Sequence, residues 1–459
     1  MENTMENIEV LIIGGGASGL MAAISSARSG ASVRILEKND RIGRKILATG
    51  NGRCNFTNLN CAGTDFMGSE PDFASKALTL FGVQDTLNFF EELGLFHREE
   101  SEGRIYPYSE QAVSVLDALE SELNRLKVEV LTSSTVTVIK KNAEGFVVLV
   151  SGGRQYRADR VIIATGGKAG VQYGCSGDGY TLAKTFGHDL IEPRPALVQL
   201  VSDAPFFRQL KGIRAKGNVT LYKKYSGKEP SGKEPSGKES SGYSLKHRHN
   251  AIAQETGEIQ FTETGLSGIC IFNLSRYIKD LAAPDGGANL QKTKKTTNVS
   301  ENTITIDLIP ELSLEALREK LALRLNHCRH KALEDFLNGI VNKRLIPILL
   351  KECKFAGVHK SCETLDLAAI DKMAAILKEW PIKIIGTKGF QDAQTTTGGI
   401  DAKQIDDATF ESKLIPGLYF TGEVLDVDGR CGGYNLQWAW TSGFLAGRAA
   451  AEKIEACVC

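Results

Sequence analysis

Runs of apolar residues mark two strands that should be covered on both faces. Residues Val10 to Ile13 contain no polar side chain, and residues 158–167 hold a second such run before the turn A-T-G-G. Strands of parallel sheets with helices on both faces read as continuous apolar runs. After the first run come a glycine turn, a helical stretch and a second strand that ends at Glu37. This order predicts a β-α-β unit of a Rossmann-like sheet.

The middle of the chain has two other patterns. Apolar and polar residues alternate in three stretches, 218–222, 257–262 and 303–308. Such alternation is typical of antiparallel strands with one buried face. Between residues 313 and 378 the apolar spacing becomes helical, beginning with the leucines at 314, 317, 321 and 325. We therefore expect an inserted antiparallel sheet or barrel and a small helical module.

One segment of the insertion is neither strand nor helix. Residues 226–242 repeat the sequence S-G-K-E-P and contain no large apolar side chain. Such a segment cannot bury enough surface to offset the entropy lost on ordering. We interpret it as a flexible surface loop between two strands; a tether for a partner is the alternative.

The glycine turn after the first strand carries the first chemical signal. Gly14, Gly16 and Gly19 form G-x-G-x-x-G at the start of the helix, and Glu37 follows 18 residues after the last glycine. In this pattern backbone amides at the helix N-terminus receive a pyrophosphate, and the acid accepts hydrogen bonds from both ribose hydroxyls. The pattern predicts a dinucleotide site for an adenosine without a 2′-phosphate. A glycine-rich turn without a ligand is the alternative.

Two further segments favour FAD over NAD. Residues 41–58 are rich in glycine, asparagine and cations, which suits contact with phosphates and a flat ring; a solvated basic loop is the alternative. Residues 416–447 give a short strand, an acidic glycine turn and a second helix start of small residues. There Glu423 and Asp428 can accept hydrogen bonds from ribityl hydroxyls. Two glycine-lined helix starts at opposite ends of the chain suit an extended cofactor.

The order of these segments predicts a discontinuous cofactor domain. We expect an α/β fold with a glutathione-reductase-type FAD domain, an inserted antiparallel β-barrel and a small helical module. The boundaries that we expect are 1–193 with 390–459 for the FAD domain, 194–311 with 380–389 for the barrel, and 312–379 for the helices.

Composition mainly excludes certain classes of partner, location and site. Lys plus Arg and Asp plus Glu both total 55, so we expect neither nucleic acid nor an anionic membrane as the main partner. No apolar run is long enough to span a bilayer, and the N-terminus is acidic where an export signal would be basic, which predicts a cytoplasmic protein. The ten cysteines form no C-x-x-C pair, as expected of reduced thiols. The stretch His327 to His330 lacks the partners of a metal site, so we expect no metal.

Together these motifs resemble the bacterial two-dinucleotide-fold flavoproteins that include aminoacetone oxidases and bile-acid-inducible 3-dehydro-bile-acid enone reductases. The resemblance rests on G-G-G-A-S-G-L at 14–20, K-I-L-A-T-G-N-G-R-C-N-F-T-N at 45–58, A-T-G-G at 164–167, G-C-S-G-D-G-Y at 174–180, E-I-Q-F-T-E-T-G-L-S-G at 258–268, T-T-G-G-I at 396–400 and the run 417–440. It implies a non-covalently bound FAD. Cys175 and Ser176 stand where the family often has Ser and Thr.

From the motifs and the resemblance we assign one set of residues to the cofactor. They are Gly14, Gly16, Ala17, Ser18, Gly19, Glu37, Lys38, Arg44, Lys45, Gly50, Asn51, Gly52, Cys54, Asn55, Val136, Ala164, Thr165, Gly166, Gly422, Glu423, Asp428, Gly433, Tyr434, Asn435 and Leu436. We assign no catalytic side chain. A redox dithiol of Cys54 and Cys431 is a hypothesis; two small residues that fill space beside the ring are the alternative. Tyr106 and Tyr108 are candidates for lining the substrate cleft.

The chemistry that we expect is hydride transfer through flavin N5 to a small-molecule substrate. No second G-x-G-x-x-G follows a buried strand, so NAD(P)H would act only as a transient electron donor. The leading function is an FAD-dependent reductase of a conjugated alkene (enone) in a hydrophobic or steroid-like molecule. The alternatives are an FAD-dependent oxidase or dehydrogenase of a small amine such as aminoacetone, and a non-catalytic flavin-binding redox sensor.

Overall fold

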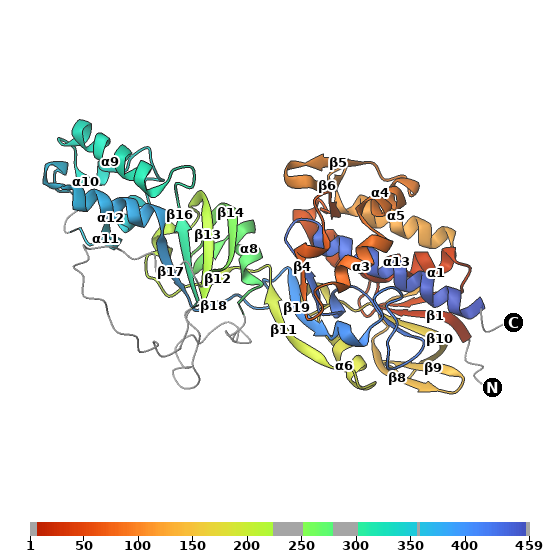
Figure 1. Cartoon of the computed structure of the whole chain (residues 1–459). Coiled ribbons are helices and arrows are strands. Elements are labelled where there is room, and N and C mark those ends of the chain that lie inside the picture. Colours follow the sequence, from red (N-terminus) through yellow and green to blue (C-terminus); the bar gives the residue numbers. More distant parts are fainter. Residues whose placement is uncertain (1–6, 224–250, 279–301, 356–358, 456–459) are drawn as a thin grey trace. The chain divides into compact units, whose positions relative to one another are not determined.

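The chain folds into two compact units. The computed structural model describes residues 7–223, 251–278, 302–355 and 359–455. Unit 1 comprises Met1–Ala196 and Phe390–Cys459, and unit 2 comprises Leu197–Gly389 (Figure 1). The repetitive segment 226–242 lies outside the described residues.

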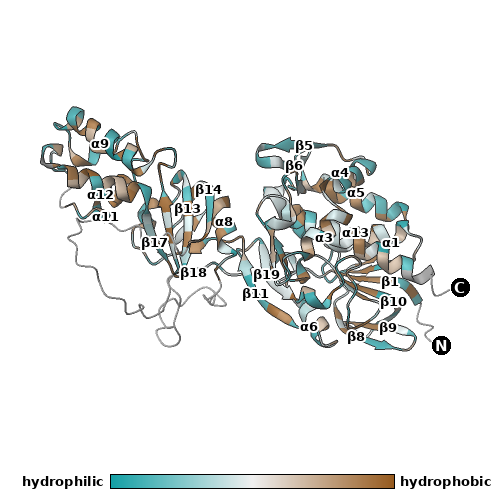
Figure 2. Ribbon diagram, viewed as in Figure 1, coloured by the Kyte–Doolittle hydropathy of each residue, from teal (hydrophilic) through white to brown (hydrophobic). Residues whose placement is uncertain are grey.

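Unit 1 is built around a sheet in the order β7-β2-β1-β10-β9-β8, with β20 also paired to β10. The four pairings among β1, β2, β7, β10 and β20 are parallel, and β9 pairs antiparallel with β8 and β10. The bounds are β1 Asn7–Ile13, β2 Val33–Leu36, β7 Glu129–Leu131, β8 Val136–Asn142, β9 Gly145–Val150, β10 Gln155–Ile163 and β20 Leu418–Phe420. The apolar runs seen in the sequence are β1 and the end of β10, which are buried and stand out as apolar in Figure 2.

Helices and short strands complete unit 1. The helices are α1 Ala17–Arg28, α2 Arg44–Ala48, α3 Phe73–Leu80, α4 Val83–Glu92, α5 Ala112–Arg125, α6 Asp178–Lys184 and α13 Tyr434–Glu455. The short strands are β3 Thr57–Asn58, β4 Phe66–Gly68, β5 His97–Glu100, β6 Arg104–Pro107, β11 Leu190–Ala196, β19 Thr395–Ile400 and β21 Val427–Gly429.

The first and last helices of unit 1 pack directly on each other. Ser25 donates a hydrogen bond to the carbonyl of Phe444 at 2.8 Å, and Ser26 donates to the carbonyl of Gly447 at 2.8 Å. A Cβ atom on Gly447 would collide with the Ala22 carbonyl, so only glycine permits this approach. The N-terminal and C-terminal segments therefore form one structure, although 419 positions separate Ser25 from Phe444 in sequence.

Unit 2 contains a seven-stranded antiparallel sheet in the order β17-β16-β13-β14-β15-β12-β18. Its strands are β12 Leu200–Val201, β13 Arg214–Lys223, β14 Ala251–Phe261, β15 Gly265–Ser267, β16 Asn302–Asp307, β17 Trp380–Ile384 and β18 Gly386–Thr387. Within the described residues this sheet does not close on itself, so we describe an inserted antiparallel sheet and not a barrel.

The helices of unit 2 share a core with this sheet. They are α7 Phe207–Leu210, α8 Ile269–Ser275, α9 Leu314–Cys328, α10 Leu333–Phe336, α11 Ile346–Glu352 and α12 Leu367–Lys378. The leucines of α9 at the predicted helical spacing, Leu317, Leu321 and Leu325, are buried. Lys378 joins α12 to the segment after β16 because its ammonium lies 2.5 Å from the Asp307 carboxylate and donates to the carbonyls of Ile309 and Leu312.

Candidate functional site

The turn between β1 and α1 leaves backbone exposed at one of its three motif glycines. A Cβ on Gly14, which has a φ of +108°, would lie 2.5 Å from the Ala164 carbonyl, and a Cβ on Gly19 would collide with the Gly14 carbonyl. A Cβ on Gly16 would meet no atom within 4 Å. Gly16 is also the N-cap of α1, and no side chain caps this helix end. The turn therefore presents an open, positively polarised helix N-terminus.

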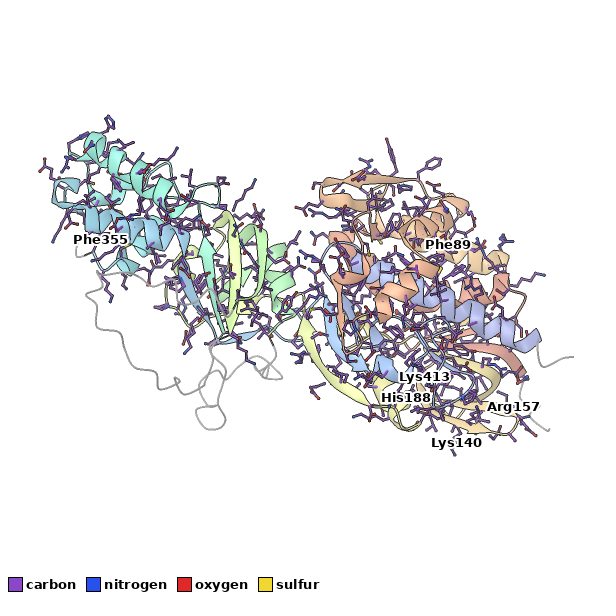
Figure 3. The ribbon with its side chains drawn as sticks, viewed as in Figure 1. Phe89, Lys140, Arg157, His188, Phe355 and Lys413 are labelled. Carbon is purple, nitrogen blue, oxygen red and sulfur yellow. The ribbon has the colours of Figure 1, made fainter. Side chains whose placement is uncertain are left out.

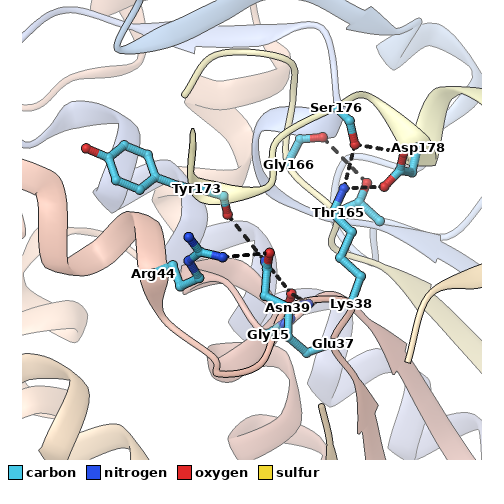
Figure 4. A network of polar contacts seen from close by, with 10 residues as sticks. All are labelled: Gly15, Glu37, Lys38, Asn39, Arg44, Thr165, Gly166, Tyr173, Ser176 and Asp178. Atoms are coloured by element: carbon cyan, nitrogen blue, oxygen red, sulfur yellow. Dashed lines mark hydrogen bonds and ion pairs between the residues drawn. The ribbon is translucent and has the colours of Figure 1, made fainter. Parts of the chain in front are cut away.

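Glu37 follows β2 directly and faces this turn from the neighbouring strand. Its buried carboxylate accepts a hydrogen bond from the Gly15 amide at 2.7 Å through Oε2, and from the backbone and side chain of Asn39 at 2.8 and 2.6 Å through Oε1 (Figure 4). The sequence pattern predicts that this carboxylate serves both ribose hydroxyls. Since Oε1 already has two donors, Oε2 is the oxygen with acceptor capacity left.

A polar network joins Glu37 to the loop that follows β10. Asn39 donates to the Tyr173 carbonyl at 3.3 Å and accepts from Arg44 at 3.0 Å (Figure 4). Arg44 also donates to the Gln172 carbonyl at 3.1 Å. A pocket of about 340 Å³ opens beside this network, lined by Arg41, Arg44, Leu47, Ala48, Gln172 and Tyr173.

Cys175 and Ser176, which stand where the family often has Ser and Thr, leave one hydroxyl in this network. Lys38 pairs with Asp178, and Ser176 donates to Asp178 at 2.8 Å while it accepts from Lys38. Cys175 is buried, which raises the pKa of its thiol. The hydroxyl at 176 therefore takes part in the loop's hydrogen bonds, while position 175 is occupied by a buried neutral thiol.

An ion pair between Lys45 and Glu423 joins the N-terminal and C-terminal motifs. The Lys45 ammonium lies 2.6 Å from Glu423 Oε2 and 3.1 Å from the Ala169 carbonyl. Glu423 Oε1 accepts from the Thr396 amide at 2.9 Å. Burial lowers the pKa of Lys45, but the charge and hydrogen bond of Glu423 outweigh it, so that this pKa lies above its ordinary value. Lys45 is therefore charged at neutral pH.

Hydrogen bonds join the segment 50–58 to α13 and to the turn that precedes it. Asn58 donates to the Gly432 carbonyl at 2.8 Å, and Trp440 donates to the Phe56 carbonyl at 2.8 Å. Gly433 has a φ of +98°, and a Cβ there would collide with the Thr57 carbonyl. These contacts bring together the two segments that suggested FAD.

A buried acceptor lies at this junction. The side-chain oxygen of Asn55 has no hydrogen-bond partner among the described residues, and it lies 3.0 Å from the position that a Cβ on Gly433 would take. Buried polar atoms in folded proteins nearly always have a partner. An unpartnered oxygen beside two glycines with positive φ, Gly432 and Gly433, is what a site for a hydrogen-bonding ligand would leave.

Asn435 and Tyr434, both assigned to the cofactor, make contacts within the protein. The Asn435 side chain accepts from the Gly429 amide at 2.8 Å and donates to the carbonyls of Gly429 and Arg430. The Tyr434 ring meets the ring of Phe66 edge to face, with 6.4 Å between their centres. Asn435 therefore closes the turn before α13.

The other assigned residues lie in the segments already described. Asp428 is fully buried in β21. Val136 is buried at the start of β8, and the Ser134 amide two residues before it donates to the Glu37 carbonyl at 2.8 Å. Ser18, in the first turn of α1, donates to the Thr421 carbonyl at 3.4 Å. The remaining positions are Ala17 and Leu436 in the first turns of α1 and α13, Asn51 and Gly52 in the segment Thr49–Gly52 after α2, which we call the glycine loop, Thr165 and Gly166 after β10, and Gly422 after β20.

Residues that the sequence reasoning did not assign also hold the site together. Thr396 accepts hydrogen bonds from the amides of Lys168 and Ala169 at 2.9 and 3.0 Å, and Ser442 accepts from the Gly422 amide at 2.9 Å. Thr396 belongs to the motif T-T-G-G-I, so a signal for it was present in the sequence. Ser442 lies inside a helix and had no comparable signal.

The two cysteines of the dithiol hypothesis are free thiols. Burial raises the pKa of Cys54 to about 12 and that of Cys431 to about 11. Cys431 contacts the Gln394 side-chain oxygen at 3.6 Å. Since the thiolate is the reactive form of cysteine, the raised pKa values favour small space-filling residues over a redox pair.

The two candidate cleft tyrosines differ. Tyr106 is buried, and the Arg53 guanidinium lies 4.2 Å from the centre of its ring. Its ring edge also lies 3.3 Å from the position of a Cβ on Gly50, and burial raises the pKa of its hydroxyl. Tyr108 is 62% exposed and stacks with Arg98. Tyr106 is therefore the one that contacts the glycine loop.

Two kinds of feature are missing from the part of the chain that the structure describes. It contains no group of three or more His, Cys, Asp or Glu side chains arranged to hold a metal ion. None of its helices combines the length and the apolar character needed to cross a membrane.

Comparisons with known proteins match nearly the whole chain. The model of the HI0933-like protein Rossmann domain matches residues 8–449. The 3-dehydro-bile acid delta(4,6)-reductase of Clostridium scindens is 41% identical over 96% of this chain and 98% of its own length. The ribosomal RNA dihydrouridine synthase of Haemophilus influenzae is 29% identical over 95% of this chain and 96% of its own length. Among solved structures, 3-ketosteroid-delta4-(5alpha)-dehydrogenase from Rhodococcus jostii RHA1 is 15% identical, with 98% of both chains covered and a TM-score of 0.47.

Proposed function

This chain belongs to the HI0933-like family and is an FAD-dependent oxidoreductase, and from that premise we propose that it reduces a carbon–carbon double bond conjugated to a carbonyl group. The observation that carries the proposal is the 41% identity, over nearly the full length, to a reductase of a 3-dehydro-bile acid. With a carbonyl at position 3 and double bonds at positions 4 and 6, the substrate for which that reductase is named contains one conjugated system. The substrate class that we favour is therefore a steroid-like or other hydrophobic enone.

The residues of unit 1 fit FAD. Gly16 leaves open space in front of an uncapped helix N-terminus, which suits the pyrophosphate. Glu37 Oε2 suits a ribose hydroxyl, and the pocket beside Arg44 suits the adenosine end. Near the other end of the cofactor, Glu423 suits the ribityl chain and the Asn55 oxygen suits a ring N–H group.

Reduced FAD, when bound, would supply a hydride from N5 to the β-carbon of the conjugated system, and the α-carbon would take a proton from water. The part of this chain is to bind and orient: the glycine turns hold the two ends of the cofactor, and the Lys45–Glu423 pair fixes the ribityl region between them. We propose NAD(P)H as the electron donor, acting transiently without a dinucleotide fold of its own.

An anaerobic mixing experiment tests the reaction type. The yellow protein is reduced with NADH or NADPH and then mixed with a 3-keto steroid enone, a saturated 3-keto steroid as the matched control, or oxygen, while flavin absorbance is followed. We expect the enone to restore the oxidised spectrum faster than oxygen does and the saturated ketone to have no effect. Reduction of the oxidised protein by aminoacetone, with no response to any enone, would instead support the amine oxidase alternative.

A second substrate class has a specific observation in its favour. The relative that is 29% identical is named for making dihydrouridine in ribosomal RNA, and uracil also contains a ring double bond conjugated to a carbonyl. In addition, residues 197–389 contain 30 Lys and Arg against 21 Asp and Glu, which suits an anionic substrate for unit 2. We therefore propose the uracil base of RNA as the second candidate, with the same reaction at the flavin.

A further inference from the structure

The zero net charge of the chain is the sum of the net charges of two units, one positive and one negative. Residues 197–389 carry an excess of nine positive charges, and the rest of the chain contains 25 Lys and Arg against 34 Asp and Glu. The expectation that the chain has no nucleic-acid partner rests on the total charge alone. Association with a polyanion depends instead on the charge of the surface that meets it.

Much of the excess lies in one part of the helical module. Residues 324–360 contain eight Lys and Arg but three Asp and Glu. Exposed cations of this stretch that form no ion pair within the described residues include Arg329, Lys331, Lys351, Lys354 and Lys360. Other exposed cations of unit 2 do have partners, as in the pairs Lys211–Glu263, Arg214–Glu258 and Arg318–Asp371.

Backbone contacts hold three of these cations close together. Ala332 and Ser361 form an isolated antiparallel bridge. Around it, the Leu333 amide donates to the Lys360 carbonyl at 2.8 Å, and the Cys362 amide donates to the Lys331 carbonyl at 2.9 Å. Ser361 also donates to the Arg329 carbonyl at 3.0 Å. We call Arg329, Lys331 and Lys360 the basic patch.

Further exposed polar and charged side chains lie in the same stretch of sequence as the basic patch. His330 and His359 are exposed neighbours of these residues in sequence, and the pair between His359 and Glu334 uses one of the nearby acids. Lys351 and Lys354 follow at the end of α11, next to Phe355, which Figure 3 labels on this module. Lys351 and Lys354 are therefore further exposed cations of the same stretch of sequence.

The apolar residues of the module favour a nucleic acid over a membrane surface. Helices that lie on membranes combine cations with a continuous exposed apolar face. Here the apolar side chains of α9 and α11, such as Leu321 and Leu349, are buried in the core of unit 2. The large apolar side chains that are exposed on the described part of the module are Leu323 and Leu367, one on each of two helices.

We propose that the basic patch of the helical module binds the phosphate backbone of RNA. Lys and Arg side chains without an acidic partner neutralise phosphates and release their counterions, which supplies affinity without reading base sequence. The choice of RNA over DNA rests on the second substrate candidate of the proposed function, because the relative that suggests this candidate is named for acting on ribosomal RNA. Phosphate binding itself depends only on the patch.

The test measures RNA binding by the full-length FAD-loaded protein. The probe is a fluorescein-labelled RNA hairpin with a uridine-rich loop, followed by anisotropy over a range of salt concentrations. The triple variant Arg329→Gln, Lys331→Gln and Lys360→Gln should bind roughly tenfold or more weakly in low salt. Its log–log salt slope should be shallower by about 2 to 3, since each phosphate contact contributes about 0.7 to 0.9.

A matched control removes the same charge from the same unit. The triple variant Lys211→Gln, Arg214→Gln and Arg318→Gln loses three exposed cations that have ion-pair partners, and we expect it to bind RNA nearly as the parent does. Equal losses in the two triple variants, no RNA binding at low salt, equal binding of a DNA hairpin, or stronger binding to phosphatidylserine vesicles than to RNA would each overturn the proposal. The flavin spectrum and enone turnover of both variants separate its failure from failure of the proposed function.

Discussion

Gly16 and Gly19 lie in one motif, but an added methyl group would meet different surroundings at each. At Gly16 it would enter open space, with backbone angles that any residue adopts. At Gly19 it would collide with the Gly14 carbonyl. The two positions therefore separate the need for cofactor access from the need for close packing.

The variant Gly16→Ala should fold normally but bind FAD poorly. We expect the free energy of unfolding of its apo form to change by less than about 1 kcal/mol, because nothing lies within 4 Å of the new atom. Its FAD affinity should fall roughly tenfold or more, because backbone approach to the pyrophosphate is blocked. Urea unfolding and flavin fluorescence titration measure the two quantities.

The control variant is Gly19→Ala, which should lower apo stability by about 1 to 3 kcal/mol through overpacking. The account of the turn is contradicted if Gly16→Ala retains full FAD affinity, or if its apo form is as destabilised as that of Gly19→Ala.

The sequence predicts the motif residues of the site but not their hydrogen-bond partners. The glycine spacing and Glu37 were readable because the motif has a fixed length and each residue type has a stated physical task. The partners of Glu37 and Asn435 were not readable, because a carboxylate or amide accepts whichever donor the fold brings near it. Here the donors come from Asn39 and Gly15 for Glu37, and from the turn at Gly429 for Asn435.

At the scale of elements, a buried carboxylate joins α1 and α5. Glu122 of α5 accepts hydrogen bonds from Arg125 on its own helix at 2.7 and 2.8 Å and from Arg28 at the end of α1 at 2.7 Å. The hydrogen bonds of Arg125, followed by those of Arg28, lower the pKa of Glu122 from 4.5 to about 2. The charged form is thus strongly favoured in the folded protein.

This shift gives a pH dependence with a definite sign. A carboxylate with a lowered pKa in the folded state contributes stability above its unfolded pKa, and this contribution is lost as the pH falls from about 4.5 to about 2. Glu122→Gln should therefore lower the free energy of unfolding by up to about 3 kcal/mol at pH 7 and by much less near a pH of about 2.5. Urea titrations at the two pH values measure this. A loss of the same size at both would show that charge is not the cause.

Element types were more predictable from the sequence than the way in which they assemble. The apolar runs predicted β1 and the end of β10, and the leucine spacing predicted α9. A strand that is buried on both faces has a continuous apolar run, and a helix that is buried along one stripe has apolar residues every three or four positions. Closure of the inserted strands was not predictable, because alternation fixes which face is buried but not which edge strands pair. The described residues form an open order with β17 and β18 at its ends.

At the scale of the whole molecule, the two ends of the sequence build one site. Hydrogen bonds between α1 and α13, the Lys45–Glu423 pair, and the bond from Asn58 to Gly432 all connect the beginning of the sequence with its end. The insertion between them forms unit 2 with its own core. The total charge of zero does not show that the two units differ in net charge. The difference appears only when residues 197–389 are counted separately.

The most direct test of the central claim is titration of the apo protein with FAD and with FMN, followed by flavin fluorescence. The account predicts that one FAD binds per chain and that FMN, which lacks the adenosine and the second phosphate held by the N-terminal turn, binds at least roughly a hundredfold more weakly. Equal affinity for FMN and FAD, or no binding of either, would contradict a site in which both ends of the chain hold one dinucleotide.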